Sequence, residues 1–197
     1  MLRPRILCAD CNELLGKEVE ERAEAAGLGM MLRPSDGTTL YRLTQKDQRA
    51  LATWAAKVAL LEPYMRIRPT SADPQHLADF REHLRPPPTF AVWFGAYSGK
   101  GPYSRFVHRT TEITVTAPHQ PPQKYPGEIL TFYIGHALFQ VFKGQTARPH
   151  TVRSPDPFGG ALVRIWPPRS GEFLWPTWPW VTPETFAFFA LVGVPLP

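Results

Sequence analysis

The sequence TQKDQRALATWAAKVALLEP, residues 44–63, carries the clearest secondary-structure signal of the chain. Thr44 and Asp47 form a capping-box pattern, in which the threonine hydroxyl accepts a hydrogen bond from a free amide at the helix start and Asp replaces the usual Glu. Apolar residues then recur on one face at helical spacing: Leu51, Trp54, Val58 and Leu61. We therefore predict an amphipathic helix that ends at Pro63 and packs its apolar face on a sheet.

An earlier helix is predicted over residues 13–26. This segment is rich in helix-forming residues, and its apolar positions share one face at three- and four-residue spacing: Leu15, Val19, Ala23 and Ala26. Acidic residues occupy the opposite face, which we interpret as a solvated surface. Gly27 and Gly29 are expected to end this helix.

After the long helix the chain changes character. Asp73 and Pro74 open a short helix that reaches about Leu84, and three consecutive prolines, residues 86–88, form a stiff connector. Four segments beyond it are rich in β-branched and aromatic residues and are separated by turns that contain Gly or Pro: residues 90–97, 105–116, 129–142 and 161–166. We interpret these segments as strands of an antiparallel meander.

The C-terminal region combines tryptophan and proline. WPTWPW, residues 175–180, is too rich in proline for a helix or a strand interior, and we interpret it as packing over a sheet edge. A surface on which peptides or bases stack is the alternative. A short helix from Pro183 to Leu191 follows. The sequence thus predicts an α+β fold with N-terminal helices, an antiparallel β-meander sheet and a short C-terminal helix.

Composition narrows the classes of function. Of the 197 residues, 43% are hydrophobic and 12% are aromatic, which is enough to fill the core of a folded domain. A net charge of +5 permits an acidic partner such as nucleic acid without requiring one. Because the chain has two cysteines, no export signal and no apolar run of membrane-spanning length, we expect a cytoplasmic protein without a membrane segment.

The pattern with metal-ligand spacing is CADC, residues 8–11, directly before the first helix. Two thiolates separated by two residues can bind one tetrahedral zinc ion, and a helix start favours the thiolate form. Cys8 and Cys11 are the only cysteines, so they supply half of a zinc site. The other ligands would come from another chain or from histidines: His76, His83, His108, His119, His136 or His150. Two inert or redox-labile thiols are the alternative interpretation.

No residue pattern in the sequence assigns catalysis. A catalytic cysteine would need a histidine base, and the first histidine is His76. SGKG, residues 98–101, lacks the spacing of a phosphate-binding loop and is interpreted as a hairpin turn. His136 lies between apolar residues of a predicted strand and is interpreted as a structural histidine. We therefore assign no catalytic residue, and no nucleic-acid-binding residue is assigned from the sequence.

Two segments carry a resemblance to a known family. ILCADCN, residues 6–12, followed by the glutamate-rich helix and by QRALATWAAK, residues 48–57, resembles bacterial and phage HNH-endonuclease-like proteins. The later segments IWPP and WP, residues 165–168 and 175–176, are similar as well. The resemblance implies a treble-clef zinc element, of which residues 1–29 are a remnant, followed by an α+β accessory domain over residues 30–197.

The resemblance also implies an upstream segment with a first cysteine pair and a catalytic histidine, whereas no histidine precedes Cys11 here. We therefore expect a non-catalytic accessory or interaction domain that binds nucleic acid or another protein. The first alternative is a zinc-dependent HNH-type DNA endonuclease whose catalytic half is missing or comes from another chain. The second is a phage or mobile-element structural protein that forms oligomers through its aromatic sheet face.

Overall fold

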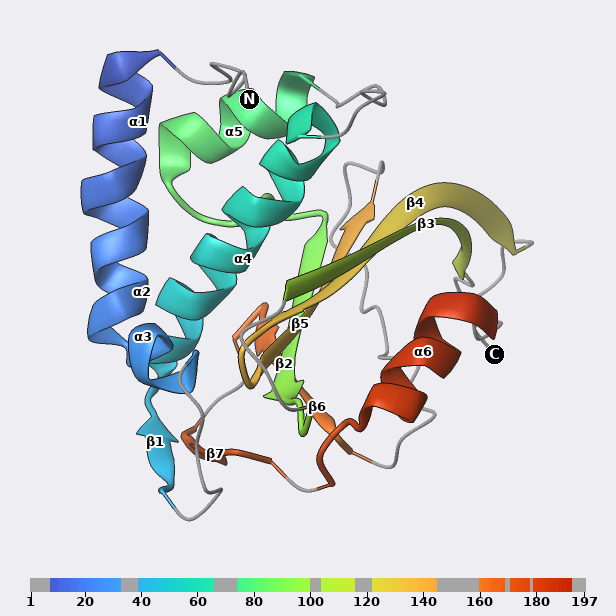
Figure 1. Cartoon of the computed structure of the whole chain (residues 1–197). Coiled ribbons are helices and arrows are strands. Elements are labelled where there is room, and N and C mark those ends of the chain that lie inside the picture. The colour runs from blue at the N-terminus through green and yellow to red at the C-terminus, as the bar shows by residue number, and fades with distance from the viewer. Residues whose placement is uncertain are drawn as a thin grey trace.

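A computed structural model of the chain shows a layer of helices packed on one face of an antiparallel sheet (Figure 1). This arrangement confirms the predicted α+β class. The structure describes these parts of the chain: residues 8–32, 39–65, 74–99, 104–115, 122–144, 160–168, 171–177 and 179–192. Among them, no helix is both long enough and apolar enough to cross a membrane.

The N-terminal helix begins earlier than predicted and changes its winding. It consists of α1 (Ala9–Leu15), a π-helical turn η1 (Gly16–Glu20) and α2 (Glu21–Ala25), which follow one another as a single rod (Figure 1). Its predicted apolar face is buried. Gly27 adopts a φ of 92°, a left-handed conformation that ends the rod before the short helix α3 (Leu28–Met31).

The long helix α4 (Gln45–Met65) begins at the predicted capping box. Thr44 Oγ1 accepts the amide of Asp47 at 3.3 Å, and the Asp47 carboxylate accepts the amide of Thr44 at 2.9 Å. The prediction that Pro63 ends the helix was wrong, because the helix continues to Met65. A proline in the last turn of a helix removes one backbone hydrogen bond but does not end the helix at that residue.

Helix α4 lies between the N-terminal rod and the sheet (Figure 1). The Trp54 ring lies 6.1 Å from the ring of Phe132 and 5.4 Å from that of Phe139, which confirms that the predicted apolar face packs on the sheet. Four small residues of α4 are fully buried: Ala52, Ala55, Ala56 and Ala59. Lys57, also buried, forms an ion pair with Glu20 of η1. Alanine side chains let the neighbouring helices approach closely.

The main sheet has the strand order β3-β4-β5-β2-β6, with antiparallel pairs throughout. Its strands are β2 (Phe90–Ala96), β3 (Ser104–Val115), β4 (Gln123–Ile134), β5 (Ala137–Gly144) and β6 (Leu162–Trp166). The meander therefore holds for β3, β4 and β5, whereas β2 inserts between β5 and β6. The segment 129–142, predicted as one strand, is a hairpin, because Gly135 turns with a φ of 58° inside a continuous apolar pattern.

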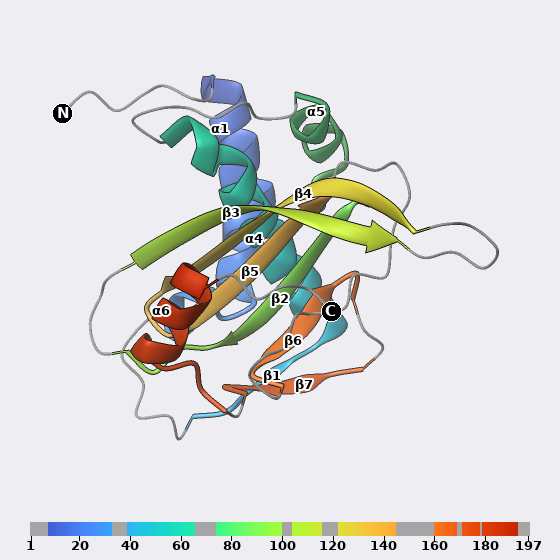
Figure 2. The same ribbon diagram turned by 90° about the vertical axis from the view of Figure 1, so that its right-hand side faces the viewer.

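The remaining elements lie on the two faces of the main sheet or beside it. Helix α5 (Pro74–His83) joins the helical layer, and α6 (Pro183–Val192) lies on the opposite face of the sheet, as Figure 2 shows. Strands β1 (Tyr41–Leu43) and β7 (Phe173–Trp175) form a separate pair. Trp175 is buried and its indole N–H donates to the carbonyl of Gly95 at 3.1 Å, so this part of the tryptophan–proline segment packs on the sheet, against the inner strand β2 and not over an edge as predicted. Trp178 lies outside the described residues.

Candidate functional site

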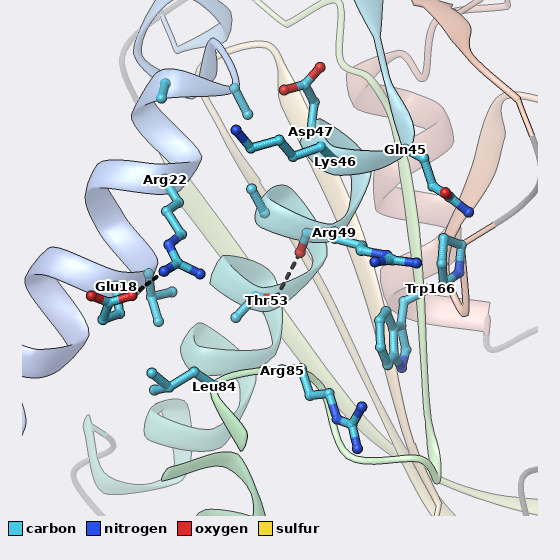
Figure 3. Close-up of a pocket in the computed structure, with 15 residues that line it drawn as sticks. Glu18, Arg22, Gln45, Lys46, Asp47, Arg49, Thr53, Leu84, Arg85 and Trp166 are labelled. Atoms are coloured by element: carbon cyan, nitrogen blue, oxygen red, sulfur yellow. Dashed lines mark hydrogen bonds and ion pairs between the residues drawn. The ribbon is translucent and has the colours of Figure 1, made fainter. Parts of the chain in front are cut away.

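A pocket of about 870 Å³ opens between the helical layer and the end of β6 (Figure 3). Its walls come from η1 and α2, from the first turns of α4, from the chain after α5, and from the residues at the end of β6. The volume lies within the range of about 300–1,000 Å³ that is usual for small-molecule and cofactor sites. The pocket is therefore large enough to hold a ligand of nucleotide size.

The charged groups of the pocket leave an excess of positive charge. They are four cations and two carboxylates: Arg22, Lys46, Arg49, Arg85, Glu18 and Asp47. Arg22 forms an ion pair with Glu18, and Asp47 is engaged in the capping box. Within the described part of the chain, Lys46, Arg49 and Arg85 form no ion pair. These three side chains are available to an anionic ligand.

The position of Arg85 is set by the backbone on both sides of it. Leu84 has a φ of 46°, a left-handed conformation, and its amide donates to the carbonyl of Phe80 at 2.8 Å, which ends α5. The proline at position 86 restricts Arg85 to an extended backbone. The chain therefore leaves α5 in a fixed direction and places Arg85 along the pocket wall (Figure 3).

Trp166 reaches the pocket because β6 contains a β-bulge. Val92 of β2 pairs with Trp166, whereas the next residue, Trp93, pairs with Arg164, so that Ile165 is the extra residue. The bulge breaks the normal alternation of side chains, and both Ile165 and Trp166 pack on the core that the helices cover. In Figure 3 the Trp166 indole lies between the side chains of Arg49 and Arg85.

The indole of Trp166 has a buried donor without an acceptor. Its Nε1 atom has no hydrogen-bond partner among the described residues, although that atom is buried. An unsatisfied buried donor costs free energy. The described lining contains no histidine or cysteine, and both of its carboxylates are engaged. The arrangement is therefore suited to binding an anion next to a flat ring.

The structure brings together the two predicted metal ligands. Cys8 caps α1, and the amide of Cys11 in the first turn donates to Cys8 Sγ at 3.3 Å. Hydrogen bonds from the Cys11 thiol and then from its amide lower the pKa of Cys8, whereas the thiol–thiol hydrogen bond raises the pKa of Cys11. Cys8 is exposed and Cys11 is partly buried.

No histidine of the described ranges completes this zinc site. No three His, Cys, Asp or Glu side chains within those ranges come together as a metal-binding group. His136 lies in the turn between β4 and β5, not inside a strand as predicted, and its Nδ1 lies 2.7 Å from the carbonyl oxygen of Tyr97. The other described candidates have their own neighbours: Thr89 for His76, Asp79 for His83 and Glu128 for His108. His119 and His150 lie outside the described residues.

Sequence reasoning missed the basic pocket. Its three available cations and its tryptophan come from three separate segments: Lys46 and Arg49 in α4, Arg85 after α5, and Trp166 in β6. The sequence signals were weak, an arginine directly before three prolines and a tryptophan before a proline pair. Neither signal shows that these residues share one pocket.

Comparison with known proteins found no match to a family model, to a curated protein or to a solved structure. The geometry of the chain itself is therefore the basis for a functional assignment.

Proposed function

We propose that this chain is a nucleic-acid-binding accessory domain, related to HNH-endonuclease-like proteins and without catalytic residues of its own. The observation that carries the proposal is the set of three unpaired cations, Lys46, Arg49 and Arg85, around one pocket in the described structure. Two of them lie at the start of the long helix α4, where the backbone adds positive partial charge.

Phosphate is the anion that this set fits best. An arginine guanidinium is a planar donor that binds two phosphate oxygens at once, and the pocket presents two such groups, those of Arg49 and Arg85, near Trp166 (Figure 3). A nucleic acid offers phosphates in series, so that several cations are neutralised by one ligand. The net charge of +5 favours the approach of such a polyanion.

Salt-dependent binding tests the proposal. The affinity for a fluorescent 20-base-pair DNA should fall as salt rises, and Arg49→Ala and Arg85→Ala should each lower the magnitude of the log–log slope by about 0.9, the value for one lost phosphate contact. Lys17→Ala is the matched control, because it removes one exposed positive charge outside the pocket. Equal slopes for all four proteins would contradict the proposal.

A second candidate function follows from the cysteine pair. We propose as the alternative an HNH-type endonuclease whose catalytic residues come from another chain, because Cys8 and Cys11 meet at the start of a helix as two zinc ligands would. In such a protein the zinc ion would stabilise the fold. Cys8 and Cys11 would hold it together with ligands from the second chain.

Metal analysis and a cleavage assay separate the two candidates. For the accessory domain we expect less than one zinc per chain after dialysis against a mild chelator, since two ligands hold zinc weakly, and no cleavage of plasmid DNA with Mg²⁺, Mn²⁺ or Ni²⁺. Retained zinc together with metal-dependent cleavage that the Cys8→Ser variant loses would instead favour the endonuclease.

A further inference from the structure

We propose that the basic pocket takes one unpaired nucleotide of a single-stranded nucleic acid, with the base against Trp166 and the adjacent phosphates on Arg49 and Arg85. This inference rests on the proposed function and specifies its ligand as an unpaired strand. It adds a base-binding surface to the phosphate-binding groups already described.

The first argument is the position of Trp166 between two cations. In Figure 3 the indole lies between the Arg49 and Arg85 side chains, which form no ion pairs within the described structure. Phosphates precede and follow each base along a nucleic-acid strand. A strand that crosses the pocket can therefore place a phosphate on each arginine while one base meets the indole.

The second argument is that the indole itself is available. Among the described residues, no aromatic ring and no cation stacks on Trp166, whereas the rings of Trp54 and Trp175 contact other aromatic rings of the core. The buried Nε1 atom of Trp166 has no partner in the same part of the chain. A nucleobase supplies a flat face that can stack on the part of the Trp166 ring that lines the pocket.

The third argument excludes a paired base. The pocket lies between structural layers, with the η1–α2 rod on one side and the end of β6 on the other (Figure 3). In a duplex the bases are stacked and paired inside the helix, and a base must leave the stack before it can enter a protein pocket. A duplex can place its phosphates on these arginines, whereas contact between a base and Trp166 requires an unpaired nucleotide.

Two probes separate the contribution of the base to the binding affinity from the contribution of the phosphate charge. One probe is a fluorescent oligothymidylate of 12 nucleotides, and the other is an oligomer of the same length and charge in which every position is abasic. We expect the oligothymidylate to bind about tenfold more tightly, the effect of one base stacked on an aromatic side chain. Equal affinities for the two probes would overturn the inference.

A substitution assigns the difference to Trp166. Trp166→Leu keeps an apolar side chain on the core but removes the stacking surface, so that it should abolish the preference for the oligothymidylate and leave the abasic affinity unchanged. Trp180→Leu is the matched control, because Trp180 is also partly buried but does not line the pocket. A preference that persists in Trp166→Leu would place the base elsewhere and contradict the inference.

Photo-crosslinking of the unmodified protein provides a readout that does not depend on the folding of a variant. An oligothymidylate with one 5-iodouracil should crosslink to the peptide that contains Trp166, and mass spectrometry identifies that peptide. Crosslinks confined to other peptides would contradict the inference. If neither probe binds while the 20-base-pair DNA still does, the inference fails and the proposed function stands; if the duplex does not bind either, both fail. If both bind equally and Arg49→Ala weakens both, the proposed function stands and the base contact fails.

Discussion

The basic pocket and the cysteine pair lie on the same helical layer but are held in different ways. The pocket is assembled from η1, α2, α4, the chain after α5 and the end of β6. Its residue Val19 belongs to the main core, and Trp166 packs against that core. Cys8 and Cys11 are held by the first turn of α1 and by each other, and Cys8 is exposed. One site therefore depends on tertiary packing and the other on local backbone geometry.

This difference predicts how each site responds to mutation. A substitution that loosens the packing between α4 and the sheet should disturb the pocket, because its walls come from both layers. The same substitution should leave the cysteine pair in place, since its geometry arises within four consecutive residues. Conversely, removal of the two thiols should cost little stability.

The largest effect is expected for Trp54→Ala. Trp54 packs on Phe132 and Phe139 between α4 and the sheet, so that its loss should lower the free energy of unfolding by about 3 kcal/mol. Met65→Ala is the control on the same helix, because Met65 is exposed. Urea denaturation measures both. Equal stabilities for the two variants would show that packing of Trp54 on the sheet does not stabilise the core. The pocket would then not depend on that packing, and the proposed difference between the pocket and the cysteine pair would be wrong.

Acidification tests how much the charge of Glu128 contributes to the stability of the sheet. Hydrogen bonds from His108 and then Lys143 lower the pKa of Glu128 in β4 to about 2 from its usual 4.5, so its charge stabilises the fold above pH 4.5 and this contribution is lost as the pH falls towards 2. Glu128→Gln should therefore cost about 1–2 kcal/mol at pH 7, a range reduced because the carboxylate is partly exposed.

The difference between wild type and Glu128→Gln should shrink between pH 4.5 and pH 2, as measured by urea denaturation at each pH. The exposed Glu13 provides the control Glu13→Gln, for which we expect a change in stability of less than about 0.5 kcal/mol at pH 7. A constant difference over this range would show that Glu128 acts through packing instead of through its charge.

A smaller effect is expected at the capping box of α4. Thr44→Ala removes the side-chain acceptor for the Asp47 amide and one of the two donors to the Asp47 carboxylate, which lines the pocket, so it should cost about 1 kcal/mol and also weaken DNA binding. Thr182→Ala removes the equivalent cap of α6, where Thr182 Oγ1 accepts the amide of Thr185 at 3.2 Å. We expect that control to lose similar stability while its DNA affinity stays at the wild-type value, as fluorescence anisotropy would show.

The smallest effect is expected at the cysteine pair. Replacement of Cys8 and Cys11 together by Ser should change the free energy of unfolding by less than about 0.5 kcal/mol in zinc-free buffer, because serine is itself a favourable cap at position 8. DNA binding at the basic pocket should also be unchanged. A loss of several kcal/mol, or a stabilisation of the wild type by added zinc that the double variant lacks, would show that the cysteine region organises the fold.

Local patterns in the amino-acid sequence were sufficient for several features. The capping box, the helical spacing after Thr44 and the β-branched segments correctly predicted α4 and most strands, because these signals act between residues a few positions apart. The half zinc site at Cys8 and Cys11 stays a prediction. The turn at Gly135 was missed because the apolar pattern continues on both sides of it.

The strand order and the basic pocket depend on contacts between distant segments. Insertion of β2 between β5 and β6 sets which strands are neighbours, and the bulge at Ile165 turns Trp166 toward the helices. Both follow from the packing of all the apolar faces at once, since a shift of one residue in register would send every side chain of a strand to the opposite face. The pattern of apolar residues within β6 does not show where the bulge lies. The proximity of Arg49, Arg85 and Trp166 therefore arises only in the folded chain.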